Sequence, residues 1–287
     1  MDRAGILRRV LVSHYYQPAT ALWRAVEVET ILRHVRFRGR VLDLGCGDGG
    51  IGAVVMPVDC TLLGLDSSAE DLGMAQALGR YHQLCLGDAG AMPYAGASFD
   101  MIFSNSVLEH IPHLDRTLSE VGRVLRPGGE FTFTVPSDHF IGWLKWPSDY
   151  RLHGQADRAE TYIGELNARL QHYHYLAPAD WSKKLASAGM RLEKHVYYMD
   201  RRILHSWETW HYWTGRLAWK LSGDRLSPRE IQTRYRLPAI RRLVPVGLLV
   251  QVLFIPLWAS LKRRSEDCDV GACLLIRAAK AAGPGGP

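Results

Sequence analysis

The sequence predicts an α/β protein built on a doubly wound, mostly parallel seven-stranded sheet. Three observations support this fold class. Short apolar runs alternate with helical stretches, the first run leads directly into a glycine-rich loop, and acidic residues follow several of the runs. Strands that alternate with helices form parallel sheets, whose binding sites lie at the carboxyl ends of the strands.

Five strands are expected in the first 135 residues. Each is a short apolar run bounded by glycine, proline or polar residues. They cover residues 40–44, 62–66, 84–86, 99–105 and 130–135.

The helices are predicted from apolar spacing and from end signals. Residues 114–125 carry apolar side chains at helical intervals before an Arg-Pro-Gly-Gly turn at 126–129. Residues 178–188 open with a proline and end before a glycine, and residues 51–56 start a helix after the glycine loop. Residues 21–35 are expected to form a helix that lies over the cofactor as a lid.

The second half of the chain departs from regular alternation. Residues 191–198 and 270–278 are expected to be the last two strands, with about seventy residues between them. We therefore predict an N-terminal lid, a core with an aromatic cap, a helical insertion, the last strand and a disordered Gly/Pro-rich tail. These segments are residues 1–39, 40–200 with the cap at 138–177, 201–268, 269–280 and 281–287.

The glycine loop at residues 41–50 satisfies two cofactor motifs. Gly45, Gly47 and Gly50 match the dinucleotide fingerprint G-x-G-x-x-G, and Asp66 follows where a ribose-binding acid is expected. The same loop fits D-x-G-x-G-x-G, with Asp43 two residues before the first glycine. An acid at that position suits a ligand with an ammonium group better than one with a pyrophosphate. The loop alone leaves NAD and a cationic cofactor both open.

Four further motifs follow the loop in a fixed order. The five are LDLGCGDG (42–49), GLD (64–66), GDA (87–89), SFD (98–100) and LRPGG (125–129). With them, residues 41–137 resemble a class I S-adenosylmethionine-dependent methyltransferase of the type-11 group, which includes the ubiquinone/menaquinone-type enzymes. The resemblance implies the Rossmann-like methyltransferase fold and S-adenosyl-L-methionine as cofactor, and it makes NAD a distant alternative.

The resemblance also implies the cofactor-binding residues. Asp43 and the loop would hold the methionine moiety, Asp66 the ribose hydroxyls, and Asp88 the adenine amino group. The backbone N–H of Ala89 would meet an adenine ring nitrogen, while Ser104 and Asn105 would close the pocket beneath the sulfonium. The predicted set is Asp43, Gly45, Cys46, Gly47, Asp66, Ser67, Asp88, Ala89, Ser104 and Asn105. Each acid has a structural alternative, since it could instead cap a turn, cap a helix or fix a loop.

Methyl transfer from a sulfonium needs alignment and water exclusion, and it needs a base only where the acceptor loses a proton. His110 follows the fourth strand at the carboxyl edge of the sheet and is our candidate base. The alternative is that this histidine has a structural role. An apolar acceptor pocket is predicted in the cap, although loop aromatics often serve packing instead. Its residues would be Trp143, Trp146, Tyr150, His153 and Tyr173. No metal centre is expected.

Charge and cysteine usage exclude several classes of protein. The formal net charge is +6, but residues 201–267 hold 13 Lys or Arg and 5 Asp or Glu, so this segment carries +8 and the rest −2. A local basic surface is expected, and no nucleic-acid partner. The five dispersed cysteines form no C-x-x-C pair, which indicates reduced thiols in the cytoplasm. The N-terminus lacks the apolar stretch of a cleavable signal peptide.

Within the insertion, residues 243–261 carry no charge and are flanked by arginines and lysine. The length approaches that of a bilayer's hydrocarbon core, but the strands on either side must pair in one sheet, so the chain has to return. Pro245, Pro256 and Gln251 favour a broken helix. The segment could dip into one leaflet, pair with the Trp-rich residues 203–221 at a headgroup boundary, or form buried core or a dimer contact. We favour attachment to a membrane surface through 201–264.

The sequence therefore predicts a cytoplasmic methyltransferase, peripheral on the membrane, that acts on a hydrophobic or lipid-linked small-molecule acceptor. Methylation of oxygen is favoured over carbon or nitrogen. The rivals are a soluble natural-product methyltransferase whose insertion is a lid or dimer contact, and a cofactor-binding module without catalysis. The acceptor and the oligomeric state stay open.

Overall fold

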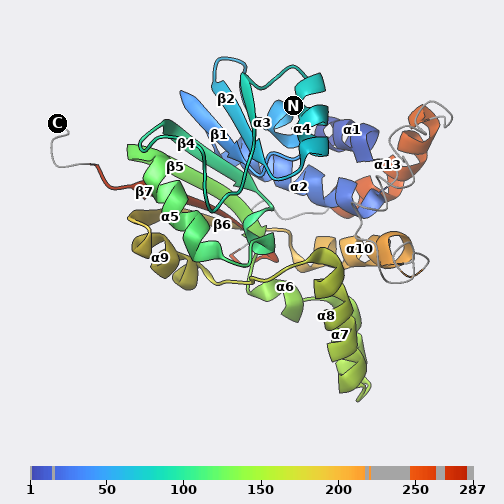
Figure 1. Cartoon of the computed structure of the whole chain (residues 1–287). Coiled ribbons are helices and arrows are strands. Elements are labelled where there is room, and N and C mark those ends of the chain that lie inside the picture. The colour runs from blue at the N-terminus through green and yellow to red at the C-terminus, as the bar shows by residue number, and fades with distance from the viewer. Residues whose placement is uncertain (1, 15–16, 217–219, 221–245, 263–268, 283–287) are drawn as a thin grey trace. The chain divides into compact units, whose positions relative to one another are not determined.

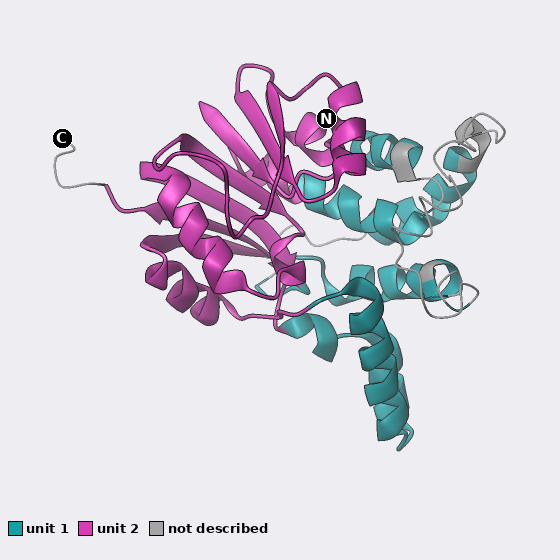
Figure 2. Cartoon of the chain, in the orientation of Figure 1, with its two compact units in different colours: residues 1–29, 139–172, 198–272 teal, residues 30–138, 173–197, 273–287 magenta. Residues whose placement is uncertain are grey.

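The computed structural model describes residues 2–14, 17–216, 220, 246–262 and 269–282. Figure 1 labels the helices and strands. The chain divides into two compact units, coloured separately in Figure 2. Unit 1 comprises Met1–Glu29, His139–His172 and Tyr198–Ala272, and unit 2 comprises Thr30–Asp138, Tyr173–Tyr197 and Cys273–Pro287.

The central element is a seven-stranded sheet with the strand order β3-β2-β1-β4-β5-β7-β6. Strands β1 to β5 pair in parallel, and β7 runs antiparallel to β5. The doubly wound, mostly parallel sheet predicted from the sequence is thus confirmed, with one antiparallel part. The strands are β1 (Arg40–Leu44), β2 (Thr61–Asp66), β3 (Gln83–Leu86), β4 (Phe99–Asn105), β5 (Leu125–Pro136), β6 (Met190–Tyr198) and β7 (Cys273–Lys280).

Two strands begin three or more residues away from their predicted starts. β5 begins at Leu125, because Leu125 already pairs with Phe99 and the Arg-Pro-Gly-Gly turn forms an irregularity within the strand. β7 begins at Cys273, three residues later than expected. Gly271 lies so close to the backbone of Tyr198 that an added Cβ would come within 2.5 Å of the Tyr198 carbonyl oxygen, so the chain is still turning there.

Helices of unit 2 begin where local signals predict. Ser68 caps α4, since its hydroxyl accepts a hydrogen bond from the backbone N–H of Asp71, and Pro178 occupies the first turn of α9. Val121 and its helical neighbours give α5 one strongly apolar face. The helices are α3 (Gly50–Val55), α4 (Ala69–Ala77), the 3-10 turn η1 (Leu108–His110), α5 (Leu114–Val124) and α9 (Pro178–Ser187).

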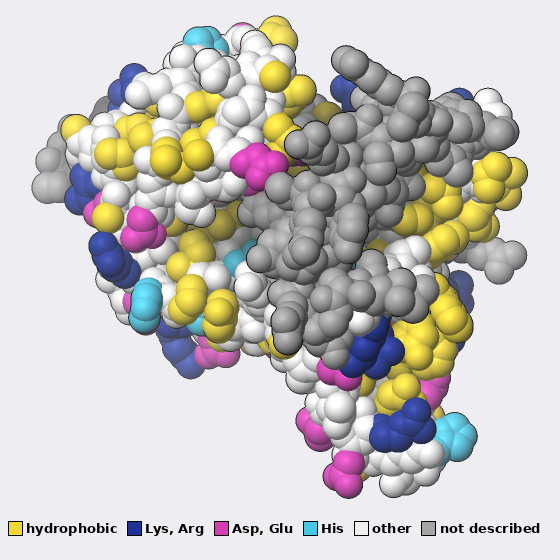
Figure 3. All heavy atoms as spheres, turned by 45° about the vertical axis from the view of Figure 1, so that its right-hand side comes forward, with side chains coloured by type: hydrophobic (Ala, Val, Ile, Leu, Met, Phe, Trp, Pro, Cys, Tyr) yellow, Lys and Arg dark blue, Asp and Glu magenta, His cyan; other side chains and the backbone are white. Residues whose placement is uncertain are grey.

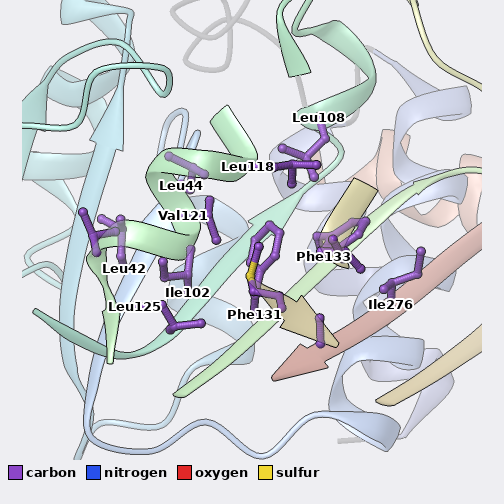
Figure 4. Close-up of a cluster of buried hydrophobic side chains, with 14 of the residues drawn as sticks. Leu42, Leu44, Ile102, Leu108, Leu118, Val121, Leu125, Phe131, Phe133 and Ile276 are labelled. Carbon is purple, nitrogen blue, oxygen red and sulfur yellow. The ribbon is translucent and has the colours of Figure 1, made fainter. Parts of the chain in front are cut away.

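The core of unit 2 lies between the sheet and the helices α5 and α9. Figure 4 shows Leu118 and Val121 of α5 among Leu44, Phe131 and other side chains from the strands. Trp181 of α9 packs on Phe133, with ring centroids 4.8 Å apart. The buried strands hold the carboxyl ends of β1, β2 and β4 in fixed register.

Unit 1 is helical. Its elements are α1 (Arg3–His14), most of α2 (Pro18–His34), α6 (His139–Gly142), α7 (Lys145–Leu152), α8 (Ala156–Leu170), α10 (Arg201–His211), a π-helical turn (Tyr212–Arg216) and α13 (Val246–Lys262). Three buried rings meet at its centre: Trp23 lies 5.3 Å from Trp207 and 5.8 Å from Phe140. The sequence pattern assigned no helices to residues 138–175, yet α6, α7 and α8 form there. In α8 the buried residues Ala159, Tyr162 and Leu166 recur at helical spacing, a signal that the aromatic and histidine residues around it obscured.

The apolar segment 243–261 is described from residue 246 onward as α13. The break expected at Pro256 is absent, since the helix runs through it. Pro256 removes a hydrogen bond to the carbonyl of Val252, but that residue is exposed, so water can satisfy the oxygen. Within the described ranges, no helix combines the length and apolar character needed to cross a membrane. Pro245, Trp219, the flanks 241–242 and 263–264, and the tail beyond 282 lie outside the described residues.

Candidate functional site

The glycine loop between β1 and α3 is shaped by left-handed backbone. Gly45, Gly47 and Gly49 have φ angles of 74°, 54° and 76°, a region that residues with a Cβ rarely adopt. The backbone N–H groups of Gly45 and Cys46 both donate to the carbonyl oxygen of Leu65, at 2.8 and 3.2 Å. These bonds tie the loop to the end of β2.

Asp43 lies on β1 just before the loop and is 4% exposed. Its Oδ2 accepts a hydrogen bond from the Tyr81 hydroxyl at 2.6 Å. Burial, followed by the negative charge of Asp66, raises the pKa of Asp43 to about 7, although the Tyr81 hydrogen bond opposes the shift. A cationic ligand group beside this carboxylate would favour its ionised form.

Asp66 ends β2 and is also buried. Oδ2 accepts the backbone N–H of Gly47 at 2.8 Å, and Oδ1 accepts that of Ser68 at 2.9 Å. The carboxylate thus holds the glycine loop and leads into the cap of α4, while Ser67 is exposed. A carboxylate has lone pairs beyond these two bonds, so ribose hydroxyls can still donate to it.

Asp88 and Ala89 follow β3 in a loop that α5 holds in place. Asp88 is exposed, and its Oδ1 accepts the backbone N–H of Gly90 at 2.9 Å. The Arg116 guanidinium donates to the Gly90 carbonyl at 2.7 Å, and Glu120 accepts the backbone N–H of Met92 at 2.7 Å. The turn presents Asp88 to solvent at the carboxyl end of β3.

Ser104 and Asn105 end β4 beside the loop. The buried Ser104 hydroxyl donates to the Leu44 carbonyl at 2.9 Å, which joins the ends of β4 and β1. Asn105 accepts a hydrogen bond from Thr134 at 3.0 Å. Ser106 then has a φ of 51°, a strained conformation for a residue with a side chain.

His110 lies on η1, and its side chain is 40% exposed. The neighbouring Glu109 is buried, and its carboxylate Oε1 lies 3.9 Å from His110 Nε2. The backbone N–H of Tyr173 donates to the Glu109 carbonyl at 2.8 Å, so the last part of the cap segment contacts η1. A buried carboxylate beside an accessible imidazole is an arrangement that can orient a base.

The aromatic residues predicted to form an acceptor pocket divide between the units. Trp143, Trp146, Tyr150 and His153 belong to unit 1, and Tyr173 belongs to unit 2. Within unit 1, Trp143 stacks on His139, with ring centroids 5.4 Å apart. Trp146 lies at a tilt 5.2 Å from Tyr212, and Tyr150 lies 6.4 Å from Tyr162. His153 is exposed, and its Nδ1 lies 2.7 Å from the Asp149 carbonyl oxygen. These contacts are packing contacts of the helices that carry them.

Three residues of unit 2 were missed in the sequence analysis: Tyr81, Glu109 and Ser106. Tyr81 precedes β3 without a motif of its own, and its partner Asp43 lies 38 positions earlier. Glu109 sits in the run VLEH (107–110) beside the histidine that was chosen, and an acid among apolar residues is a signal that could have found it. Positive φ at Ser106 leaves no signal in the sequence.

The loop fits a cationic cofactor better than a dinucleotide. In a dinucleotide site the glycine-loop N–H groups point at a pyrophosphate, but here Gly47 donates to Asp66. Burial, followed by the charges of Asp43, Asp66 and Asp48, raises the pKa of the Cys46 thiol, so all three acids lie near Cys46. Their negative charge repels a pyrophosphate and attracts an ammonium or sulfonium group.

Comparison with known proteins agrees with this geometry. Residues 42–133 match the family model described as a methyltransferase domain. Malonyl-[acyl-carrier protein] O-methyltransferase of Enterobacter lignolyticus is 36% identical over 125 residues, 42% of this chain and 49% of that protein. Sterol 24-C-methyltransferase of Clavispora lusitaniae is 32% identical over 129 residues, 42% of this chain and 34% of that protein. The chain thus spans half or less of the length of these relatives.

The same fold occurs in the crystal structure of the [4+2]-cyclase SpnF, with a TM-score of 0.57 and 18% identity over 91% of this chain and 82% of that one. The sheet order and the match of residues 42–133 identify a methyltransferase domain of the class I fold, and S-adenosylmethionine is the cofactor that this kind of domain implies. The match over residues 42–133 agrees with the resemblance to type-11 methyltransferases that the motifs of residues 41–137 had indicated.

Proposed function

We propose that this protein transfers a methyl group from S-adenosylmethionine to a hydrophobic or lipid-linked small-molecule acceptor, with oxygen favoured over carbon or nitrogen as the methylated atom. The observation that carries the proposal is the pair of buried carboxylates, Asp43 and Asp66, that enclose the glycine loop. They suit a ligand with positive charge at one end and a ribose beside it.

When bound, the cofactor supplies a methyl group on a positively charged sulfur. In our proposal Asp43 and the backbone at Gly45–Gly47 hold its amino-acid end, Asp66 accepts the ribose hydroxyls, and Asp88 and Ala89 meet the adenine. Ser104 and Asn105 would line the floor beneath the sulfonium. Alignment of donor and acceptor supplies much of the rate enhancement in such a displacement.

His110 would take the proton from an acceptor hydroxyl. Its exposure leaves the imidazole accessible, and the Glu109 carboxylate 3.9 Å away favours the protonated form that results. A carbon or nitrogen acceptor that keeps its proton until after transfer would not need this base. Trp143, Trp146, Tyr150, His153 and Tyr173 remain our candidates for acceptor contacts.

The acceptor class is proposed from two lines of support. The relatives named above act on an acyl-carrier-linked malonyl group and on a sterol, one through oxygen and the other through carbon. Val252 and Ile255 of α13 are exposed hydrophobic residues. Figure 3 shows hydrophobic side chains in yellow gathered on parts of one face of the molecule. An apolar acceptor would be reached at a membrane surface more readily than in water.

The first experiment is titration calorimetry of the full chain with S-adenosylmethionine, S-adenosylhomocysteine and NAD. We expect binding of both sulfur compounds and none of NAD. An Asp43→Asn variant should bind them more weakly, and absence of binding by the wild type overturns the proposal.

The second experiment presents the enzyme with labelled S-adenosylmethionine and fractionated lipid and small-molecule extracts. We expect the label in an organic-soluble product. Treatment that cleaves methyl esters or methyl ethers should release the label from that product. Label confined to water-soluble products would favour a natural-product methyltransferase with a soluble acceptor. Cofactor binding without any labelled product would favour a non-catalytic binding module.

We also propose that residues 201–264 attach the protein to a membrane surface. In the described part, α13 exposes Val252 (59%) and Ile255 (72%) while Leu257 and Leu261 are buried, so the helix presents one apolar side outward. Insertion of two such side chains contributes about 1–2 kcal/mol each.

Vesicle flotation tests this attachment with the full chain and vesicles containing anionic phospholipid. The wild type should float, and a Val252→Asp/Ile255→Asp variant should float at least several-fold less. Val58→Asp is the matched control, because Val58 is 83% exposed in unit 2. Wild-type protein that stays off the vesicles contradicts the attachment and leaves the methyltransferase proposal intact.

A further inference from the structure

We propose that Tyr81 is a positioning residue of the cofactor site, whose hydroxyl orients the Asp43 carboxylate and whose ring fixes the glycine loop. The inference rests on the proposed role of Asp43 toward the cofactor's cationic end. Tyr81 lies between α4 and β3, outside all five methyltransferase motifs.

The Tyr81 ring occupies space that three glycines leave open. A Cβ added to Gly49 would lie 2.7 Å from Tyr81 Cε2, and one added to Gly64 would lie 3.0 Å from Cδ1. A Cβ on Gly52 would collide with the Tyr81 hydroxyl and lie 2.5 Å from Asp43 Oδ2. These glycines come from the loop, from α3 and from β2, so one ring contacts all three elements around the cofactor site.

The Tyr81 hydroxyl also stabilises the negative charge of the Asp43 carboxylate. At 2.6 Å its bond to Asp43 Oδ2 has the length of a strong hydrogen bond to a carboxylate. The groups near Asp43 are Asp66 at the end of β2 and Cys46 in the loop, and the charge of Asp66 opposes ionisation of Asp43. Among the interactions resolved at Asp43, the Tyr81 hydrogen bond is the one that favours the carboxylate.

This arrangement has a directional consequence for binding. A cofactor with a cationic group binds the ionised carboxylate, and its affinity therefore rises with pH until Asp43 is deprotonated. Removal of the hydroxyl raises the pKa of Asp43 further and moves that rise to higher pH. It also frees the carboxylate to rotate, which weakens binding even when Asp43 is ionised.

The test is the Tyr81→Phe variant, which keeps the ring and removes the hydroxyl. Affinity for S-adenosylhomocysteine is measured by calorimetry between pH 6 and pH 8 for variant and wild type, so that titration of the ligand cancels in the ratio. We expect the variant to bind about tenfold more weakly at pH 7 and the ratio to shrink as the pH rises. Tyr94→Phe, at a partly buried tyrosine that packs on Phe99, is the matched control and should leave the affinity unchanged.

A double-mutant cycle makes the test specific to Asp43. In an Asp43→Asn background, Tyr81→Phe should change the affinity less than twofold, because the carboxylate it orients is gone. The inference is overturned if Tyr81→Phe has wild-type affinity at every pH. It is also overturned if Tyr81→Phe lowers the affinity equally in the wild-type and Asp43→Asn backgrounds. Failure of the wild type to bind would overturn the proposed cofactor role instead, so the two failures are distinguishable.

Discussion

The carboxylate of Asp66 accepts a 2.8 Å hydrogen bond from the backbone N–H of Gly47. The acid at the end of one strand thus shapes the loop at the end of the neighbouring strand. This relationship explains why the loop, although it matches a dinucleotide fingerprint letter by letter, does not offer that N–H to a pyrophosphate. Under the ribose-binding role proposed for Asp66, one residue would serve both binding and stability.

Replacement of Asp66 should therefore affect both properties. Asp66→Ala removes the acceptor of the Gly47 and Ser68 N–H groups, so we expect the free energy of unfolding to fall by about 1–3 kcal/mol. Affinity for S-adenosylmethionine should fall at least about tenfold, since the ribose acceptor is lost as well. Denaturant unfolding and calorimetry measure the two effects. Asp59→Ala, at an exposed acid of unit 2, should change neither.

Gly52 provides a steric test of the same site. Gly52→Ala places a methyl group 2.5 Å from Asp43 Oδ2 and against the Tyr81 hydroxyl, so the contact must open. We expect a loss of stability of about 1–3 kcal/mol and weaker cofactor binding. Gly73→Ala is the matched helical control: a Cβ there meets nothing within 4 Å, and the change should be neutral or stabilise by about 0.5–1 kcal/mol. Equal thermal stability of the two variants would contradict this packing.

His211 makes the stability of unit 1 sensitive to acid. Its Nε2 accepts a hydrogen bond from Arg169 at 3.0 Å, and its ring stacks on Trp207 at 4.9 Å. Burial, with the charge of Arg169 and His172, lowers the pKa of His211 to about 3. Between pH 6.5 and 3 the unfolded chain binds a proton at this residue that the folded protein does not, so stability falls as the pH falls through this range.

We expect His211 to contribute to the slope of the free energy of unfolding plotted against pH. The histidine contributes up to about 1.4 kcal/mol per pH unit to the free energy of unfolding in that window. His211→Gln keeps an acceptor for Arg169 but cannot be protonated, so it should remove about one proton from the uptake on unfolding. The exposed His153→Gln variant should leave the slope unchanged. Denaturant unfolding at several pH values measures it, and identical slopes for wild type and His211→Gln would refute the assignment.

Arg277 and Glu130 link β7 to β5 through two hydrogen bonds of 2.9 Å each. Burial acts to raise the pKa of Glu130. Hydrogen bonds from Arg277 and Thr132 nevertheless leave this pKa below its ordinary value. Stability from this carboxylate is therefore present above pH 4.5 and is lost as the pH falls below it.

Arg277→Met should cost about 1–3 kcal/mol at pH 7, toward the low end because the arginine is one-third exposed. Arg191→Met is the control, since the Arg191 side chain is 83% exposed in its contact with Glu193. A comparison of denaturation midpoints decides the matter, and equal midpoints for the two variants would count against a stabilising pair.

Local features of the sequence account for the sheet and for the cofactor class. Apolar runs of strand length are buried on both faces of a parallel sheet, so their alternation with helices is written into consecutive residues. The positive φ values at Gly45, Gly47 and Gly49 likewise follow from residue type. The start of α9 at Pro178 could likewise be predicted from residue type. Helices α6 to α8 could not be predicted in this way.

What the sequence by itself determined is the fold class, the positions of the strands along the chain and the class of cofactor. The tertiary structure decided the rest: that Tyr81 holds Asp43, that Glu208 accepts the backbone N–H groups of Lys145 and Trp146 at the start of α7, and that Arg277 secures Glu130. Each of these contacts joins residues at least 38 positions apart. The energies of these contacts come from burial and from the close approach of charged groups. Both arise only when the chain folds, and no local spacing of residues encodes them.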